Sequence, residues 1–324
     1  MRQLKIQSFL LLSFLIIAQS IQAQKPSKAS IRYFSKVADI IKKYYYFIDI
    51  VNFKKIEINA KRYLVHSTTA NEAYPAIDTL LYNLPDHHNY FWRPKINENL
   101  NRIFFLQYPT GQFLSDKIAY IKVPYMIGHH DSAKVWADSL RSIYDLYDDN
   151  NTKGWIIDLR GNFGGAIHPM LTGLYPFWGD TTILSFQQRN VGSGKFKFVN
   201  GFLVETLEEK NVMQFISYKK LNSGVDKRKV AVLIDNKVGS SGEILTIALR
   251  NRENTKLFGT QTAGIPTIIR NWTLSDGAYL GIVTGVFFDK LNNPYIHAIK
   301  PDVQVSSTNN TELINKAIEW INEK

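Results

Sequence analysis

The chain has 324 residues, 45% of them hydrophobic, which is enough for one large core or for a large and a small domain. It contains no cysteine, so neither disulfide bonds nor a lipid anchor on cysteine are expected. Its formal net charge is +11, but the basic residues are scattered and not gathered beside stacking aromatic residues, so a nucleic-acid function is not expected.

Residues 1–23 have the pattern of a secretory signal peptide. Two basic residues lie within the first five, an apolar centre runs from Phe9 to Ala18, and small or polar residues lead to Ala23. The apolar run is shorter than a membrane-spanning helix requires. We expect cleavage after Ala23, with Ala18 and Ser20 as alternatives. The remaining chain is then periplasmic or secreted, without stable membrane insertion.

Residues 24–85 predict a small helical domain. Apolar residues recur at helical spacing in three stretches, at 30–47, 52–65 and 69–84. Pro75 lies inside the third stretch, so that helix either starts there or is kinked there. The aromatic run from Tyr44 to Phe47 is interpreted as packing and not as a ligand site.

A turn with two adjacent histidines follows, with the sequence Asp86-His87-His88-Asn89. Taken alone, a histidine pair in a loop is interpreted as solvent-exposed. A metal site formed by these residues with His129 and His130 is not expected, because the spacing lacks an i,i+4 or Cys/His pattern.

From residue 86 onward, strands alternate with helices, which predicts a mixed α/β core with parallel strand pairs. Strands are predicted at 118–123, from Gly154, within 186–218, at 230–234 and at 255–258. A glycine-rich hairpin is predicted at 191–194. Helices are predicted at 132–147, 170–178, 244–250 and 311–324.

The strand that begins at Gly154 ends in a turn containing three glycines, Asp158-Leu159-Arg160-Gly161-Asn162-Phe163-Gly164-Gly165. Asp158 and Arg160 fall on one face of an extended strand, and their apolar neighbours favour a paired, structural role. Gly164 and Gly165 can adopt backbone angles closed to other residues and bring amides close to a ligand. The turn lacks the features of a P-loop and the spacing of a dinucleotide fingerprint.

A second strand, Val230–Ile234, ends in the turn Asp235-Asn236-Lys237-Val238-Gly239-Ser240-Ser241-Gly242-Glu243, before an apolar helix. Ser240 and Glu243 match a capping box, in which each side chain satisfies a backbone donor. Alternatively, Ser240 is a nucleophile near the positive end of the helix dipole. From these residues alone, the capping interpretation is favoured.

Together these motifs resemble the tricorn and C-terminal processing (tail-specific) serine peptidase family. Residues 158–165 are similar to its D-x-R-x-N-x-G-G signature. Residues 239–243, followed by 258–264, are similar to its nucleophile turn and the strand after it. Residues 299–302 match its closing P-D element, with Ala298 at the position of the glycine.

The resemblance implies acyl transfer from peptide or unfolded-protein substrates, with no cofactor. Ser240 is the implied nucleophile, and Ser241 is the alternative. The family's D-x-H-S turn implies His88 as the base, with His87 second, although Asn89 stands where Ser is usual. The oxyanion is expected to contact the amides of Ser241 and either Gly164 or Gly165.

The resemblance also implies a crotonase-like superhelix of ββα units at 86–324, after the helical domain at 24–85. Trp92 to Lys117 is too short to hold the PDZ domain of the processing proteases, so the chain resembles the PDZ-lacking, tricorn-type branch. Residues expected to support the site are Asp158, Arg160, Asn162, Glu243 and His297.

The chain departs from the family pattern at two places. Gly264-Ile265 replaces the G-K element, which excludes a Ser-Lys dyad. The orienting Glu of the tricorn-type branch has no match at 292–297, where Tyr295 or His297 is a possible substitute. These departures leave an alternative open: a catalytically inactive member that binds peptides or small apolar ligands in the same cleft.

Overall fold

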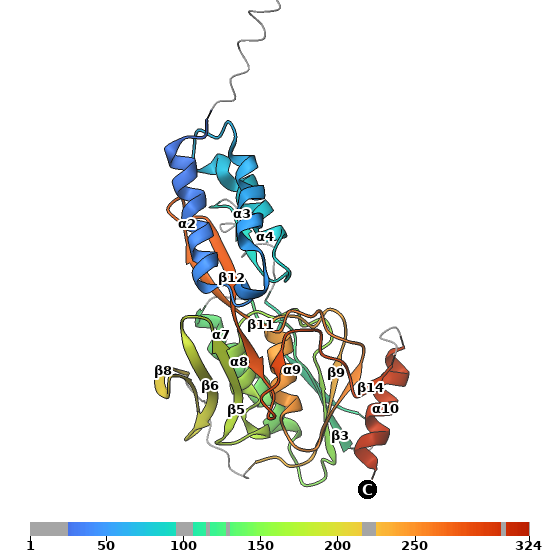
Figure 1. The fold of residues 1–324 in the computed structure, drawn as a ribbon. Coiled ribbons are helices and arrows are strands. Elements are labelled where there is room, and N and C mark those ends of the chain that lie inside the picture. The colour runs from blue at the N-terminus through green and yellow to red at the C-terminus, as the bar shows by residue number, and fades with distance from the viewer. Residues whose placement is uncertain are drawn as a thin grey trace, which may run out of the picture. The chain divides into compact units, whose positions relative to one another are not determined.

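The computed structural model describes residues 25–94, 106–114, 117–127, 130–215, 225–305 and 309–323 (Figure 1). The chain divides into two compact units, one formed by Met1–Lys43 and Phe47–Pro85, the other by Tyr44–Tyr46 and Asp86–Lys324. The expected signal peptide lies outside the described residues. None of the helices in the described ranges is both long and apolar enough to cross a membrane.

The smaller unit is helical, and each predicted helical stretch contains a helix. The helices are α2 (Lys28–Tyr44), α3 (Phe53–Lys61) and α4 (Tyr74–Tyr82), with the 3-10 turns η1 (Ile48–Ile50), η2 (Arg62–Leu64) and η3 (Asn71–Ala73). Pro75 lies in the first turn of α4, where its missing N–H costs nothing, so the helix starts there and is not kinked. The apolar stripes form a core with the buried residues Phe34, Val37, Ile41, Ile77 and Leu80.

The first sheet of the larger unit carries both sequence motifs. Its strand order is β14 (Val303–Gln304), β10 (Thr255–Gly259), β9 (Lys229–Ile234), β4 (Gly154–Asp158), β3 (Ile118–Lys122) and β2 (Thr110–Phe113). All neighbours pair in parallel except β2 and β3. Helices bury both faces of β4 and β9, which explains why both strands are continuous apolar runs.

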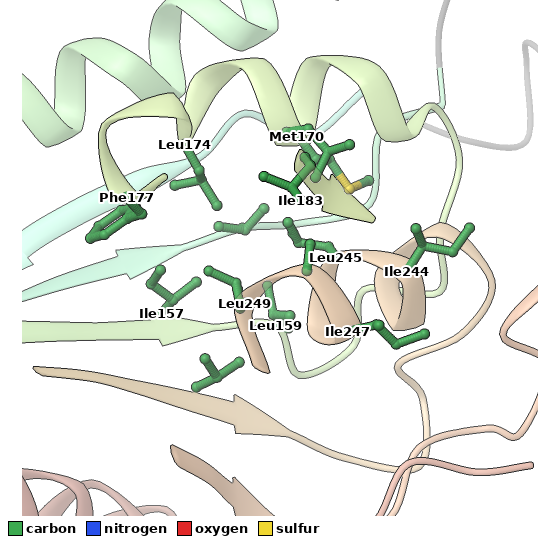
Figure 2. Packing of buried hydrophobic residues seen from close by; sticks show 14 of the residues in the cluster. Ile157, Leu159, Met170, Leu174, Phe177, Ile183, Ile244, Leu245, Ile247 and Leu249 are labelled. Carbon is green, nitrogen blue, oxygen red and sulfur yellow. The ribbon is translucent and has the colours of Figure 1, made fainter. Parts of the chain in front are cut away.

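Helices cover this sheet on both sides. On one face lie α7 (His130–Tyr147), α8 (Ile167–Gly173) and α9 (Ser241–Arg250), and on the other lies α10 (Asn310–Asn322). Alternate residues of β9 divide between the two layers, since Val232 packs with the first group and Ala231 with α10. Figure 2 shows Leu245 and Leu249 of α9 among the buried side chains that join this helix to α8 and β4.

The second sheet is antiparallel. Its order is β1 (Tyr90–Trp92), β12 (Tyr279–Phe288), β5 (Thr182–Gln188), β6 (Gly192–Val199), β7 (Phe202–Leu207) and β8 (Lys210–Phe215), and both β11 (Thr267–Thr273) and β13 (Pro294–Tyr295) also pair with β12. The predicted hairpin at 191–194 joins β5 to β6. The sequence interpretation missed β12, although its apolar run is fully typical of a buried strand.

One predicted helix is shorter than expected. The prediction was 170–178, whereas α8 ends at Gly173 and a 3-10 turn, η5 (Tyr175–Phe177), follows. Pro176 lies inside this turn, and a residue without an N–H cannot continue an α-helical ladder. The apolar residues of this segment are buried all the same, so the error concerns the helix and not the core.

A buried carboxylate, Asp226, connects the start of β9 to the helical layer. It accepts hydrogen bonds from Trp155 Nε1 at 2.7 Å and from the Tyr144 hydroxyl at 3.1 Å. Its salt bridge with Arg228 measures 2.5 Å. Burial acts to raise the pKa of Asp226, but the hydrogen bonds and charge of Arg228 hold it below its ordinary value.

We therefore expect Asp226→Ala to lower the free energy of unfolding by about 1–3 kcal/mol, because it leaves the buried donors of Trp155 and Tyr144 without their acceptor, while Arg228 keeps its ion pair with Asp148. Asp138→Ala, which breaks an exposed pair with Lys134, is the control and should cost about 1 kcal/mol or less. Urea denaturation measures both. Equal effects would contradict the role given to Asp226.

Candidate active site

The turn between β9 and α9 holds Ser240 in a strained backbone conformation. Its φ is 50° and its ψ is −120°, a combination that costs a non-glycine residue on the order of 1–3 kcal/mol. Ser240 and Glu243 form a capping-box pair. In this pair the Ser240 amide donates a hydrogen bond to the Glu243 carboxylate at 3.1 Å. The Glu243 amide donates to the Ser240 carbonyl at 2.9 Å, so the backbone already supplies an acceptor for it. The Ser240 hydroxyl is therefore available to another partner.

Glu243 is fully buried and connects the serine turn to a second loop. The described residues supply four hydrogen bonds to its carboxylate, from Ser240 N at 3.1 Å, Thr262 Oγ1 at 2.5 Å, and the amides of Gly264 and Ile265, each at 2.8 Å. Burial raises the pKa of Glu243, and these hydrogen bonds oppose the rise. The carboxylate thus fixes residues 262–265 against the first turn of α9.

The two sequence motifs lie side by side because β4 and β9 are parallel neighbours, with Asp158 opposite Leu233. Parallel strands end at the same edge of a sheet, so the turns after them meet. Past the strand ends, Leu159 N donates to Leu233 O at 2.9 Å, and Gly239 N donates to Asn162 O at 3.1 Å. The glycine turn and the serine turn therefore form one continuous edge.

The paired glycines allow this close approach. Both have positive φ, 118° for Gly164 and 105° for Gly165. A Cβ on Gly164 would lie 2.9 Å from Ser240 Cβ, and one on Gly165 would lie 2.0 Å from Met126 O. A side chain at either position would displace the turns, which explains why the contact requires glycine.

The amides of the two glycines differ in their availability. Gly164 N already donates to Asn162 Oδ1 at 3.0 Å, so it is occupied. Within the described ranges, the amides of Gly165 and Ser241 have no hydrogen-bond acceptor. The Gly165 carbonyl accepts from Ser241 Oγ at 2.6 Å, which ties this peptide to the start of α9. Of the alternatives Gly164 and Gly165, only Gly165 has its amide open.

Asp158 and Arg160 form the expected pair. Asp158 is 1% exposed and lies 2.5 Å from Arg160 Nη2 and 3.2 Å from Lys122 Nζ, and the Tyr120 hydroxyl donates to it at 2.6 Å. Burial acts to raise the pKa of Asp158, but Arg160 and Lys122 hold it below its ordinary value. The pair is structural, since it fixes the end of β4 without contacting Ser240.

His88 lies against Ser240 despite their separation in sequence. Its Nε2 is 3.0 Å from Ser240 Oγ, and its Nδ1 is 2.7 Å from Thr267 Oγ1. Burial lowers the pKa of His88 to about 4, and the nearby charge of Asp86 only partly opposes this. The imidazole is therefore neutral near pH 7 and able to accept a proton.

The turn that carries His88 is anchored through Asp86. This carboxylate accepts from the His88 amide at 3.1 Å, from Asn89 Nδ2 at 2.7 Å and from the Tyr45 hydroxyl at 2.5 Å. Asn89 Oδ1 accepts in turn from Val283 N of β12 at 2.8 Å. Asn89, which departs from the family pattern, thus joins the histidine turn to the second sheet.

Two other histidines considered from the sequence lie elsewhere. His87 is exposed, and His297 is also exposed. Neither is hydrogen-bonded to Ser240 or His88 in the described part of the chain. Tyr295 pairs with β12. Tyr295 and His297 were suggested as substitutes for the orienting Glu, but the side chain that contacts the second nitrogen of His88 is Thr267, which the sequence interpretation missed.

Thr262 and Thr267 gave no local signal in the sequence, because a threonine in a strand or turn is common and no spacing rule links it to a histidine. Thr262 Oγ1 accepts from Ile299 N at 2.8 Å while donating to Glu243. The closing P-D element acts nearby, where Asp302 Oδ2 accepts from Leu257 N at 2.8 Å. Thr262 thus joins the P-D element to α9, and Asp302 joins it to β10.

The sequence profile described as Peptidase family S41 matches residues 117–305. The chain belongs to this family. The S41 match covers both turns and the P-D element, and the His88 turn lies upstream of it.

Among curated S41-related sequences, the nisin-resistance protein of Lactococcus lactis subsp. lactis is 33% identical over 202 residues, covering 62% of this chain and 59% of that protein. The chloroplastic carboxyl-terminal-processing peptidase 2 of Arabidopsis thaliana is 24% identical over 59% of this chain and 32% of its own length. The chain thus spans less than two thirds of either relative. A lipoprotein from Streptococcus agalactiae has a similar fold, with a TM-score of 0.68 at 19% identity over 91% of this chain and 96% of that one.

The contacts of Glu243 predict a measurable cost for its amide analogue. Glu243→Gln places an NH₂ group against backbone N–H donors, so we expect a loss of about 1–3 kcal/mol in the free energy of unfolding. Urea denaturation measures it, and Glu319→Gln on the exposed face of α10 is the control. A stability equal to that of the control would show that the carboxylate does not hold the loop.

Proposed function

We propose that this S41 chain is an exported serine peptidase that hydrolyses peptide bonds of unstructured peptides, with Ser240 as nucleophile and His88 as general base. The observation that carries the proposal is the 3.0 Å contact between His88 Nε2 and Ser240 Oγ. A nucleophile within hydrogen-bond distance of a neutral imidazole is the arrangement that acyl transfer requires.

The reaction proceeds in two halves. Ser240 Oγ attacks the peptide carbonyl carbon while its proton passes to His88 Nε2. The carbon–nitrogen bond then breaks as the same proton moves to the leaving amine. Water, deprotonated by His88, attacks the resulting ester and regenerates the Ser240 hydroxyl.

The open amides of Ser241 and Gly165 are the donors for the oxyanion. Ser241 follows Ser240 in the sequence, and Gly165 is held beside it because Ser241 Oγ donates a hydrogen bond to the Gly165 carbonyl. Loss of one such donor commonly reduces turnover by about 10²–10³-fold. The amide of Gly164 does not take part, because Asn162 Oδ1 accepts its hydrogen bond. Asn162 and Glu243 act indirectly, by fixing the two turns.

Further features of the proposal rest on the family and the sequence. The core at 86–324 is a crotonase-like fold of the PDZ-lacking, tricorn-type branch, supported by the right order of the motifs. The chain acts in the periplasm or outside the cell, supported by the leader pattern at 1–23. Because one relative is named a nisin-resistance protein, nisin belongs among the peptides to be tested.

Covalent labelling distinguishes an active peptidase from the alternative, an inactive family member that binds peptides. We expect an active-site serine phosphonate to modify Ser240 in the purified protein, because His88 can take its proton. Mass spectrometry locates the adduct. An unmodified Ser240 in correctly folded protein would favour the inactive member.

Ser240→Ala is expected to abolish peptide cleavage while leaving the melting temperature within a few degrees of the unmodified protein, since the Ser240 carbonyl still accepts from the Glu243 amide. Hydrolysis of a fluorogenic peptide and thermal denaturation measure the two effects. Ser275→Ala, at an exposed position, is the control. Retained cleavage would contradict the nucleophile, and unfolding would indicate that the hydroxyl caps the helix.

The pKa of His88 predicts an unusual pH profile. His88 accepts a proton only when neutral, so kcat/KM should stay high as the pH falls and should decline near pH 4, well below the ordinary histidine pKa of 6.5. Because the unfolded chain binds this proton at higher pH than the folded chain, stability also falls between about pH 6.5 and 4. A half-maximal kcat/KM near 6.5 would contradict the burial of the base.

A further inference from the structure

The ring of His88 is held at both nitrogens by hydroxyl groups. Nε2 faces Ser240 Oγ at 3.0 Å, and Nδ1 faces Thr267 Oγ1 at 2.7 Å. A neutral imidazole has one N–H donor and one bare acceptor nitrogen. For Nε2 to receive the serine proton, Nδ1 must carry the hydrogen, so Thr267 Oγ1 must be the acceptor.

We propose that Thr267 is a positioning residue that fixes the tautomer and orientation of His88, so that the S41 site of this chain is a Ser-His-Thr relay without a carboxylate on the base. This inference deepens the proposed peptidase function and rests on it. Thr267 touches neither substrate nor reacting atoms, and it acts only through the imidazole.

The surroundings of Thr267 suit this task. It is 4% exposed, and its hydroxyl has no other hydrogen-bond partner within the described ranges. It begins β11 and lies opposite Val286 of β12, so its backbone is held by the second sheet. Its β-branched side chain also has restricted χ1 freedom.

The segment just before Thr267 is held from the other side. The amides of Gly264 and Ile265 both donate to Glu243, the buried carboxylate of α9. Glu243 therefore controls the position of the hydroxyl behind the base as well as the turn of Ser240. The orienting Glu of the family pattern has no match at 292–297. Glu243 takes over its role and acts on His88 through Thr267.

Few charged groups face the ring. Asp86, on the same turn, is engaged by Tyr45, Asn89 and the His88 amide. The other hydrogen-bond contacts of the ring, within the described residues, are the hydroxyl of Ser240 in the turn before α9 and the hydroxyl of Thr267 at the start of β11. A carboxylate on Nδ1 would stabilise the protonated ring, which a hydroxyl does much less. Because Nδ1 contacts a hydroxyl and not a carboxylate, the effect of burial outweighs the charge of Asp86, and the pKa of His88 is lowered.

The test compares Thr267→Val, which removes the hydroxyl at nearly constant shape, with Thr267→Ser, which keeps it. We expect Val to lower kcat about tenfold at unchanged KM, the effect of one neutral hydrogen bond, and Ser to stay within about threefold. Thr273→Val, at the exposed end of the same strand, is the matched control. Thermal denaturation checks that each variant is folded.

A third variant, Thr267→Asp, places a carboxylate against Nδ1. We expect it to raise the pH at which kcat/KM is half-maximal by about 1–3 units, because an adjacent anion favours the charged imidazolium. The shift tests whether the side chain at position 267 lies against Nδ1, which a residue remote from the ring would not affect. An unchanged kcat in Thr267→Val, or an unshifted profile in Thr267→Asp, would overturn the inference.

Nitrogen NMR of the His88 ring gives a readout that needs no activity. We expect the hydrogen on Nδ1 in the unmodified protein and a redistribution between the two nitrogens in Thr267→Val, with His88→Gln identifying the signals. If the protein cleaves no peptide but the Nδ1–H form is present, the proposed function fails and the positioning role stands. A hydrogen on Nε2 in the unmodified protein would refute the positioning role itself.

Discussion

The candidate site depends on one buried carboxylate in the first turn of α9. Glu243 accepts hydrogen bonds from the serine turn and from the loop that precedes β11. Ser240 occupies a backbone conformation that an isolated turn would avoid, so its neighbours must compensate for the strain. An anion at the beginning of a helix is also favoured by the helix dipole. Nucleophile and loop are thus held by the same group.

The proposed dyad joins two sheets. Ser240 follows β9 of the parallel sheet, whereas His88 precedes β1 of the antiparallel sheet and Thr267 begins β11 of that sheet. Their alignment depends on contacts that are remote in sequence, such as Asn89 with Val283 and Gly239 with Asn162. A displacement between the sheets would therefore change the distance from base to nucleophile before it changed either turn.

The sequence predicted the two turns better than their surroundings. The sequence predicted apolar strands at 154–158 and 230–234, each followed by a polar turn, and the family resemblance implied that the two turns meet. They meet because the strands are parallel neighbours and end together. The interpretation of Ser240 as a helix cap was half correct: Glu243 does bind the Ser240 amide, but the serine hydroxyl turns to His88. Local patterns cannot decide between these uses, since the deciding partner is 152 residues away.

Thr267 and Tyr45 could not be predicted from the sequence. Thr267 reaches His88 only because β11 pairs with β12, a strand that the pattern analysis missed. Tyr45 belongs to an aromatic run interpreted as packing, and it is fully buried, yet its hydroxyl also supports the histidine turn through Asp86. Both contacts arise from tertiary structure, for which single residues carry no periodicity or spacing signal.

The central claim is that the glycine turn and the serine turn form one site for acyl transfer. A crystal structure of the protein with a peptide aldehyde tests it most directly. We predict a covalent bond from Ser240 Oγ to the aldehyde carbon, with the resulting oxygen within hydrogen-bond distance of the Gly165 and Ser241 amides. An aldehyde bound elsewhere, or its oxygen facing away from both amides, would contradict the account.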